Sequence, residues 1–449
     1  MLLPFVMCVL ILYVPLPAAH TPAPWPLMLA GVAVLAVLNA AAGWLGSGLA
    51  LRLGSVRTTQ AAIEADRIFA LLKGGVVGFV LADVFLFRWP VVVERLVGVG
   101  PWAALAYDLV LVAPALVMIL TAMAWQHRYE HRQGRVTLPL GRYVWLRARV
   151  ELGILLAPWL ILVLAGGVAM VLFGNRPWAD LANGLTTGAV LVLLVVLSPL
   201  LLQAIWDTSS LPAGPLRERL EAFCRAQRFR CRDILVWHTH RHMANAGVVG
   251  PTPLIRYVML TDALLHHSPD AEVEAVFAHE VAHVRCRHLP FYVAFGLAFI
   301  VFLANLLDAL AALGWVAPIE GSLGAVMATE HGVAMLAFGA FYWVVVFGYV
   351  SRRMELQADV YAVSAVEAPS AFLSALARLR ALSRSPGGTS LWRHFSLDQR
   401  IALLERLRDD PAATAAFQRS VARLKRVFLL LAAAATLRLL VFRPELIGL

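Results

Sequence analysis

The sequence contains one arrangement of residues typical of metal-dependent hydrolysis, His279-Glu280-Val281-Ala282-His283. Residues four apart lie on the same face of a helix, so the imidazoles of His279 and His283 can bind one zinc ion. Glu280 then stands beside the metal, where it can serve as the acid–base group of a hydrolase. A pattern with three fixed positions also arises by chance, so the other ligands must decide whether a metal centre is present.

A catalytic zinc site needs three protein ligands and an open position for water, and two residues are candidates for the third ligand. His288 comes one residue earlier than the third histidine of a metzincin, and Cys286 stands where metzincins have the glycine of their turn. We therefore expect His288 to support the site or to face a loop. Glu355 is the better candidate because Asp359 follows it by one helical turn, so the glutamate can bind zinc while the aspartate holds a histidine ligand. The alternative is a solvated helix in which Glu355 pairs with a neighbouring arginine.

The composition indicates an integral membrane protein. Of the 449 residues, 60% are hydrophobic and 15% are charged, and the mean hydropathy is +0.75. These values are atypical of soluble proteins. We attribute the net charge of +10 to arginine-rich loops on one side of a membrane, and we expect no nucleic acid partner. The four cysteines have no paired spacing, so neither a disulfide framework nor a cysteine zinc site is indicated.

Apolar runs long enough to cross about 30 Å of hydrocarbon predict about eight transmembrane helices. The first run has no positively charged start, so we expect a retained span and not a cleaved signal peptide. Loops after the second and fourth spans are rich in arginine and those after odd-numbered spans are poor, so we expect residues 207–290 and 351–425 on the cytoplasmic side. The expected spans lie near residues 2–19, 27–50, 68–87, 102–125, 152–174, 186–205, 291–314 and 332–350.

These runs predict a mainly α-helical protein in which a transmembrane helix bundle carries a domain of helices and a small β-sheet with the candidate zinc site. The expected parts are a membrane bundle of about six spans at 1–206, a cytoplasmic segment with an edge strand and the motif helix at 207–290, a two-span hairpin at 291–350, a cytoplasmic segment with the candidate third zinc ligand at 351–425, and an apolar tail at 426–449.

The cytoplasmic segments contain patterns of both helices and strands. Ser268-Pro269 is expected to begin the motif helix, with serine as its N-cap, and Pro290 to end it at the next membrane span. Residues rich in β-branched and apolar side chains predict strands at 234–237, 244–250 and 257–260. Further helices are expected at 215–228, 370–383 and 397–408.

Four stretches together resemble the integral membrane gluzincin metalloprotease family, which includes the CAAX prenyl endopeptidases and the HtpX-type heat-shock membrane proteases. Ala282 stands where that family usually has a glycine and Phe395 where it usually has a proline, so the subfamily is left open. The resemblance does not extend to the first 200 residues, which the sequence indicates only to be polytopic. The four stretches are Ala244-Asn245-Ala246, then 260–265 leading to 278–283, then 351–359 with its Glu-x-x-Ala-Asp core, and 394–401.

The resemblance implies one Zn²⁺ per chain, held by His279, His283 and Glu355, with Asp359 supporting a histidine ligand. It implies that Glu280 takes a proton from the activated water that attacks the peptide carbonyl and passes it to the leaving amine.

The resemblance also assigns roles to residues outside the ligand set. His394 would stabilise the oxyanion, and Arg400 would support it or the substrate, although on sequence alone His394 is more typical of a surface or capping histidine. Asn245 and Ala246 resemble the family's edge strand, to which an extended substrate adds as a further strand. A simple turn is the alternative for that segment.

The expected function is that of a membrane-embedded zinc endopeptidase acting on membrane-associated or membrane-proximal polypeptides. The partners would be the lipid bilayer and a polypeptide substrate, either a prenylated CAAX-type protein or a membrane protein under quality control. We expect a multi-pass protein of the bacterial inner membrane whose catalytic domain faces the cytoplasm.

Two other functions compete with the endopeptidase. One is a membrane signal transducer of the β-lactam-sensor type with a related zinc domain, although no outer loop here is long enough for an extracellular sensor. The other is a transporter or channel with a coincidental motif, which would leave Glu355 and Asp359 unexplained.

Overall fold

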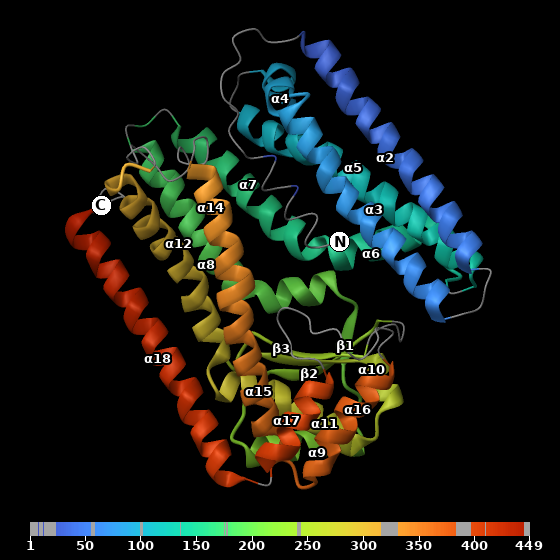
Figure 1. Cartoon of the computed structure of the whole chain (residues 1–449), viewed down its shortest axis with the longest axis vertical. Coiled ribbons are helices and arrows are strands. Elements are labelled where there is room, and N and C mark those ends of the chain that lie inside the picture. Colours follow the sequence, from blue (N-terminus) through green and yellow to red (C-terminus); the bar gives the residue numbers. More distant parts are fainter. Residues whose placement is uncertain are drawn as a thin grey trace. The chain divides into compact units, whose positions relative to one another are not determined.

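The protein is mainly helical and forms two compact units, 1–196 and 197–449, as the computed structural model shows (Figure 1). This agrees with the predicted fold class. The structure describes residues 8, 12, 24–54, 59–98, 102–134, 136–174, 176, 178–239, 244–315, 331–382, 397–408 and 410–443.

The unit 1–196 is a helix bundle around an apolar core. Buried side chains of its helices, including Val80, Val84 and Leu111, form one cluster. The Trp89 indole belongs to the same cluster and donates a hydrogen bond to the Leu111 carbonyl at 3.0 Å. Its helices are α2 (Trp25–Gly54), α3 (Thr59–Phe85), α4 (Trp89–Val97), α5 (Ala103–Arg132), α6 (Leu140–Glu151), α7 (Gly153–Phe173) and most of α8 (Ala179–Ile205).

Six described helices are long and apolar enough to cross a membrane, and the chain is therefore a multi-pass membrane protein. The predicted number of about eight spans is not confirmed. The first expected span, 2–19, lies outside the described residues apart from Cys8 and Leu12. The last, 332–350, is divided among α14 (His331–Ala340), the π-helix η1 (Phe341–Val346) and α15 (Phe347–Ala365). The six candidate spans are 25–52, 67–85, 105–132, 153–173, 181–205 and 288–312.

The unit 197–449 contains a four-stranded sheet with the order β1-β2-β4-β3. In its centre β2 (Asp233–Trp237) pairs in parallel with β4 (Tyr257–Thr261). The outer strands β1 (Thr208–Ser210) and β3 (Ala246–Val249) are each antiparallel to their neighbours. The three predicted strands are confirmed, whereas β1 is too short to show a pattern in the sequence. Within the described chain β3 is an edge strand, paired on one side only.

A buried helix, α11 (Asp270–Arg285), runs through the core of this unit. Phe277 is completely buried and meets the Phe223 ring edge-on, with the ring centroids 6.0 Å apart. Between Glu272 and Ala282, Glu280 is the one residue that is not buried, so along this stretch only the Glu280 side chain lies outside the packed core. Around α11 lie α9 (Pro215–Ala226), α10 (Asp262–His267), α15, α16 (Pro369–Leu382) and α17 (Leu397–Arg408).

Both ends of α11 differ from the prediction. Pro269, not Ser268, occupies the N-cap position, and no side-chain hydrogen bond caps the helix. The expectation that Pro290 ends it is also wrong, because Arg287 takes a left-handed conformation with φ 55° and separates α11 from α12 (His288–Ala312). Pro290 is tolerated in the first turn of α12, where backbone N–H groups have no partner in the helix.

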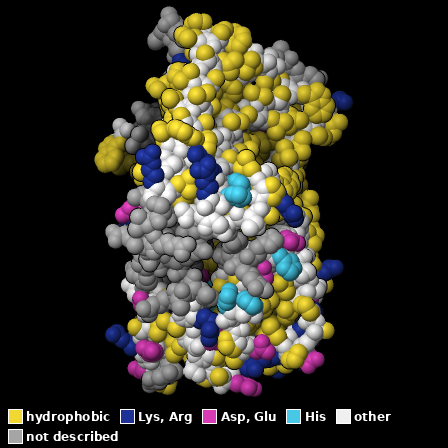
Figure 2. All heavy atoms as spheres, turned by 90° about the vertical axis from the view of Figure 1, so that its right-hand side faces the viewer, with side chains coloured by type: hydrophobic (Ala, Val, Ile, Leu, Met, Phe, Trp, Pro, Cys, Tyr) yellow, Lys and Arg dark blue, Asp and Glu magenta, His cyan; other side chains and the backbone are white. Residues whose placement is uncertain are grey.

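The apolar helices of this unit pack through aromatic rings. Phe295 of α12 stacks on Phe428 of α18 (Pro411–Phe442) with centroids 4.7 Å apart, and the Tyr342 hydroxyl of η1 donates to the Phe295 carbonyl at 2.7 Å. Since α18 begins at Pro411, it starts well before residue 426, where the apolar tail was predicted to begin. On the face drawn in Figure 2, charged and histidine side chains gather in the middle and lower parts of the view, and hydrophobic side chains cover most of the upper part.

Candidate metal centre

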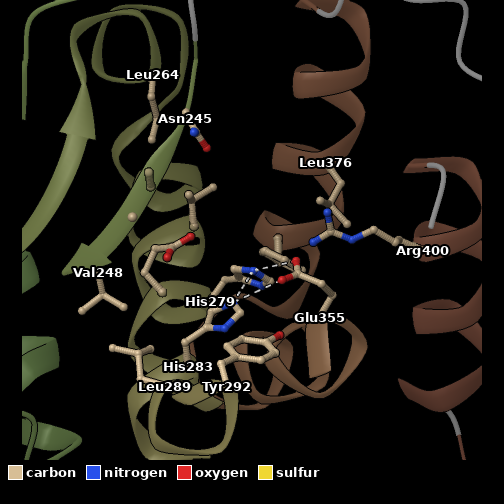
Figure 3. Close-up of a pocket in the computed structure, with 15 residues that line it drawn as sticks. Asn245, Val248, Leu264, His279, His283, Leu289, Tyr292, Glu355, Leu376 and Arg400 are labelled. Carbon is tan, nitrogen blue, oxygen red and sulfur yellow. Dashed lines mark hydrogen bonds and ion pairs between the residues drawn. The ribbon is translucent and has the colours of Figure 1, made fainter. Parts of the chain in front are cut away.

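The helices α11 and α15 bring the three predicted metal ligands together (Figure 3). One ligand atom from each of His279, His283 and Glu355 lies within 4.8 Å of the others. The two histidine Nε2 atoms are 3.3 Å apart, and each lies 3.7 Å from one oxygen of the Glu355 carboxylate. The spacing of four along α11 therefore turns both imidazoles toward the same point, and α15 supplies the carboxylate opposite them.

These separations fit a zinc ion. Atoms bound at 2.0–2.1 Å in tetrahedral geometry lie roughly 3.3 Å from one another, close to the observed 3.3 and 3.7 Å. Two imidazoles and one carboxylate are also a donor set of catalytic zinc sites, in which a fourth position remains for water or substrate. Among the described residues, this is the cluster that could hold a metal ion.

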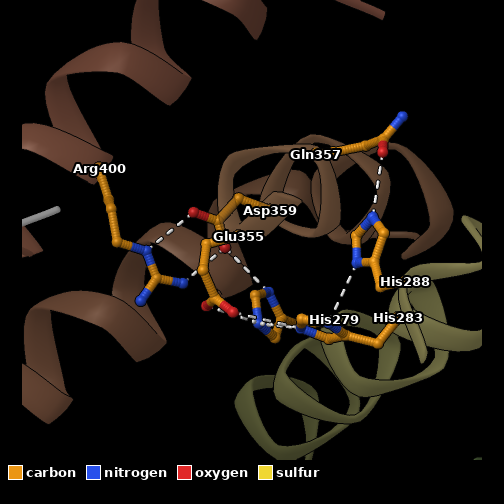
Figure 4. Close-up of polar contacts among 7 residues, drawn as sticks. All are labelled: His279, His283, His288, Glu355, Gln357, Asp359 and Arg400. Atoms are coloured by element: carbon orange, nitrogen blue, oxygen red, sulfur yellow. Dashed lines mark hydrogen bonds and ion pairs between the residues drawn. The ribbon is translucent and has the colours of Figure 1, made fainter. Parts of the chain in front are cut away.

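Asp359 contacts the ring nitrogen of His279 that is turned away from Glu355 (Figure 4). Its Oδ1 atom lies 2.8 Å from His279 Nδ1, so the other ring nitrogen is the one that faces Glu355. Arg400 donates from Nε to Asp359 Oδ2 at 2.8 Å and from Nη2 to Oδ1 at 2.5 Å. Asp359 is fully buried, and this two-point pairing with an arginine satisfies its charge.

The buried charges of the site act in opposite directions on its titratable groups. Burial alone would raise the pKa of Asp359, but the charge and hydrogen bonds of Arg400 outweigh it and lower that pKa. For His279, burial alone would lower the pKa of the imidazole. The hydrogen bond and charge of Asp359, together with the charges of Glu280 and Glu355, outweigh burial and raise that pKa. For His283, burial and the neighbouring His279 lower the pKa, which favours the neutral imidazole that metals bind.

A cavity of about 430 Å³ lies beside these ligands. Asn245, directly before β3, and Ala246, its first residue, line the cavity; both were predicted to bind substrate. Glu280 and Arg400 line it as well, so both side chains can meet a molecule that enters. Figure 3 shows Asn245 and Val248 across the cavity from Arg400 and Leu376. The apolar part of the lining comprises Val248, Leu264, Val276, Leu289, Phe372 and Leu376.

Of the two further histidines considered for the site, the structure describes His288. His394, the predicted oxyanion group, lies outside the described residues. His288 is completely buried, and its Nδ1 atom lies 3.1 Å from Nδ1 of His283, so it supports a ligand as expected and does not join the ligand group. Its other ring nitrogen lies 3.0 Å from Gln357 Oε1, a contact that the sequence did not reveal.

Three comparisons with known proteins agree with this architecture. Residues 211–408 match the model of peptidase family M48. A protease HtpX homologue of Aeropyrum pernix is 30% identical over 240 residues, which cover 49% of this chain and 73% of that protein. An HtpX homologue of Bacillus pumilus is 34% identical over 122 residues, covering 26% of this chain and 38% of that protein.

The fold has a counterpart among solved structures. The crystal structure of S. mikatae Ste24p superposes with a TM-score of 0.58 at 16% identity, covering 86% of this chain and 100% of that one. The helical fold and the clustered site define a multi-pass membrane peptidase. The chain belongs to peptidase family M48.

Proposed function

We propose that this protein is a zinc-dependent endopeptidase that cleaves membrane-associated or membrane-proximal polypeptides. The observation that carries the proposal is the convergence of His279, His283 and Glu355 at the wall of a cavity that Glu280 also lines. Zinc, when bound there, supplies a Lewis acid that acidifies water and polarises a carbonyl group.

We propose that Glu280 transfers the proton from the attacking water to the leaving nitrogen. It is the unburied residue of its helix segment and its carboxylate borders the cavity, so it can accept a proton from water and return it to the leaving nitrogen. Arg400 borders the same cavity and pairs with Asp359. We propose that Arg400 and His394 meet the substrate carbonyl, a role for which the family resemblance is the support.

The edge strand β3 is the proposed binding site for the substrate backbone. Because it is paired with β4 alone in the described chain, its outer edge can hydrogen-bond an extended peptide. Asn245, Ala246 and Gly247 bring that edge to the cavity, opposite the metal ligands. The apolar side chains of Val276 and Phe372 then offer a hydrophobic surface to the residues beside the cleaved bond.

The setting in the membrane follows from the arginine pattern. We propose that the catalytic unit faces the cytoplasm of the bacterial inner membrane, because arginine-rich loops stay on that side. α11 ends directly before α12, a candidate span, so the metal centre lies close in sequence to the membrane. Substrates that are themselves anchored in or near the bilayer suit this position, whether prenylated proteins or membrane proteins under quality control.

The experiment uses the full chain purified in detergent. Bound zinc is measured by elemental analysis, and cleavage of a panel of membrane proteins and prenylated peptides is compared between wild type and Glu280→Gln. We expect stoichiometric zinc in both forms and a loss of cleavage of about 10²–10⁴-fold in the variant. Asp270→Asn, an acidic residue at the exposed start of α11, is the matched control and should keep full activity.

Two outcomes would contradict the proposal in different ways. Stoichiometric zinc without cleavage of any substrate by the wild type would favour the signal transducer. Absence of zinc, together with no effect of Glu355→Ala, would exclude the metalloenzyme altogether.

A further inference from the structure

We propose that the helix α18 contributes to the metal centre. Its residue Lys425 positions His283 for zinc through a chain of hydrogen bonds that runs over Gln357 and His288. This inference rests on the proposed function in one respect, namely that His283 binds zinc. The family match ends at residue 408 and α18 begins at Pro411, so the contribution comes from outside the matched region.

A continuous chain of hydrogen bonds links the helix to the ligand. Lys425 Nζ donates to Gln357 Oε1 at 3.1 Å, and the same oxygen lies 3.0 Å from His288 Nε2. His288 Nδ1 then lies 3.1 Å from His283 Nδ1 (Figure 4). Gln357 Nε2 donates to Gln418 Oε1 of α18 at 2.6 Å, so the helix holds both ends of this amide.

The direction of each bond follows from its neighbour, beginning at Lys425. An ammonium group has hydrogens to donate and no lone pair to accept with, so the atom of Gln357 that faces it must be the amide oxygen. That oxygen cannot donate to His288, and therefore the hydrogen between them is on His288 Nε2. A neutral imidazole carries one hydrogen, so Nδ1 of His288 is an acceptor.

The last step fixes the ligand itself. Since His288 Nδ1 accepts, His283 must carry its hydrogen on Nδ1, which leaves a lone pair on Nε2. His283 Nε2 is the atom that lies 3.7 Å from Glu355 and 3.3 Å from His279 Nε2. The chain therefore selects the one tautomer of His283 that can bind a metal at this point.

Without the lysine the opposite arrangement becomes possible. The Gln357 amide could then turn its NH₂ group toward His288 Nε2, and the hydrogen of His288 would move to Nδ1, facing His283. His283 would have to accept there and carry its own hydrogen on Nε2, which blocks metal binding. His288 is completely buried, so solvent does not compete for these bonds.

The packing of α18 keeps Lys425 in place. Val421 and Phe428 are buried on the same side of the helix, and Phe428 stacks on Phe295 of α12. Lys425 also donates to the carbonyl of Cys286, the C-cap residue of α11, at 2.9 Å. The ammonium group thus touches the end of the helix that carries the ligand as well as the hydrogen-bond chain.

The test compares two neighbouring cations of α18 in the full-length protein. Lys425→Met removes the donor, whereas the control Arg426→Met removes an exposed charge whose hydrogen bond goes to Ala422 of the same helix. The readouts are the rate of zinc loss to an excess of chelator, and kcat and KM separately. We expect Lys425→Met to bind zinc about tenfold more weakly, as loss of a group behind a ligand does, with faster zinc loss, lower kcat and unchanged KM. The control should behave as wild type.

A second variant tests the tautomer argument directly. In Lys425→Met/Gln357→Glu a carboxylate faces His288, and because an ionised carboxylate only accepts, the hydrogen returns to His288 Nε2. We expect this double variant to recover slow zinc loss. A purely structural role of Lys425 would not be rescued by a second charge change at Gln357.

The outcomes distinguish this inference from the proposed function. If the wild type holds zinc and cleaves peptides but Lys425→Met loses zinc no faster than Arg426→Met, or the double variant stays impaired, α18 has no part in the metal centre. If the wild type binds no zinc at all, the proposed function fails and this inference fails with it.

Discussion

Replacing Asp359 by leucine would remove the carboxylate that lies 2.8 Å from His279 Nδ1 and accepts both hydrogen bonds of Arg400. Asp359 is fully buried and the Arg400 side chain is 12% exposed, and breaking such a pair by removing one partner costs about 3–5 kcal/mol of folding free energy. The loss of the group behind a histidine ligand should also weaken zinc binding by about 10- to 100-fold. Asp359→Leu is therefore expected to lower both stability and zinc affinity.

A double variant separates the two effects. Asp359→Leu/Arg400→Met replaces the whole pair by apolar side chains, a change that is often neutral for stability because no buried charge is left unpaired. His279 would still lack its acceptor, so zinc affinity should remain about 10- to 100-fold below that of the wild type. Stability should return while zinc affinity does not.

The assay measures each quantity by itself. Stability is taken from unfolding of the purified protein with zinc removed by a chelator, and zinc affinity from competition with a chromophoric chelator. The reasoning would be refuted if the double variant regained wild-type zinc affinity, because Asp359 would then not act through His279. A single variant with less than about 1 kcal/mol of destabilisation would contradict the cost expected for the buried pair.

Three further predictions concern the stability of the catalytic unit, each measured by thermal or urea unfolding. Burial alone would raise the pKa of Glu272, but its hydrogen bonds with Arg378 and Ser374 and the charge of Arg378 outweigh this and lower the pKa. Its contribution is thus present above the unfolded pKa of about 4.3 and lost as the pH falls through the lower folded value, so the deficit of Glu272→Gln should vanish in acid; a constant deficit would contradict this. Gly250→Ala should lower the free energy of unfolding by about 1–3 kcal/mol, because φ is 104° and an added Cβ would collide with the Ile255 carbonyl oxygen. An unchanged unfolding midpoint would argue against this backbone conformation. Phe277→Ala should cost about 3–5 kcal/mol because the ring is completely buried, and a loss below 1 kcal/mol would exclude it from the core.

The ligand cluster could be predicted because its geometry is local. His279 and His283 share a helix face by their spacing alone, and Asp359 follows Glu355 by one turn of another helix. Glu355 was chosen over His288 because Asp359 follows it by one helical turn, whereas His288 comes one residue too early for the third histidine of a metzincin. The structure brings the chosen three together, and it places His288 behind His283.

Contacts that depend on tertiary packing could not be predicted in this way. Gln357 faces α18 because of the way α15 and α18 pack against each other, and this packing could not be predicted from the sequence alone. Lys425 gave one signal, since it is one of two lysines in the chain and borders an apolar tail. Pairing it with Gln357 needed the fold.

Local predictions failed where the backbone departs from common preferences. A left-handed conformation is unfavourable for a residue with a Cβ, so the break between α11 and α12 at Arg287 has no signature in the sequence. Pro290 was therefore mistaken for the end of the motif helix, although it lies in the first turn of the next one. At the other end, Ser268 has the chemistry of an N-cap, but it is the C-cap residue of α10.

The π-helix η1 has a consequence for protein engineering. Its wider turn absorbs one extra residue, and one residue corresponds to about 100° of rotation along an α-helix. Before it Phe338 of α14 stacks on Phe299 of α12, and after it Glu355 faces His279 and His283. A chimera that replaced 341–346 by six residues of regular α-helix would turn the carboxylate away from both histidines. Every ligand would still be present in its sequence, and a motif search would score an inactive hybrid as a complete metalloprotease.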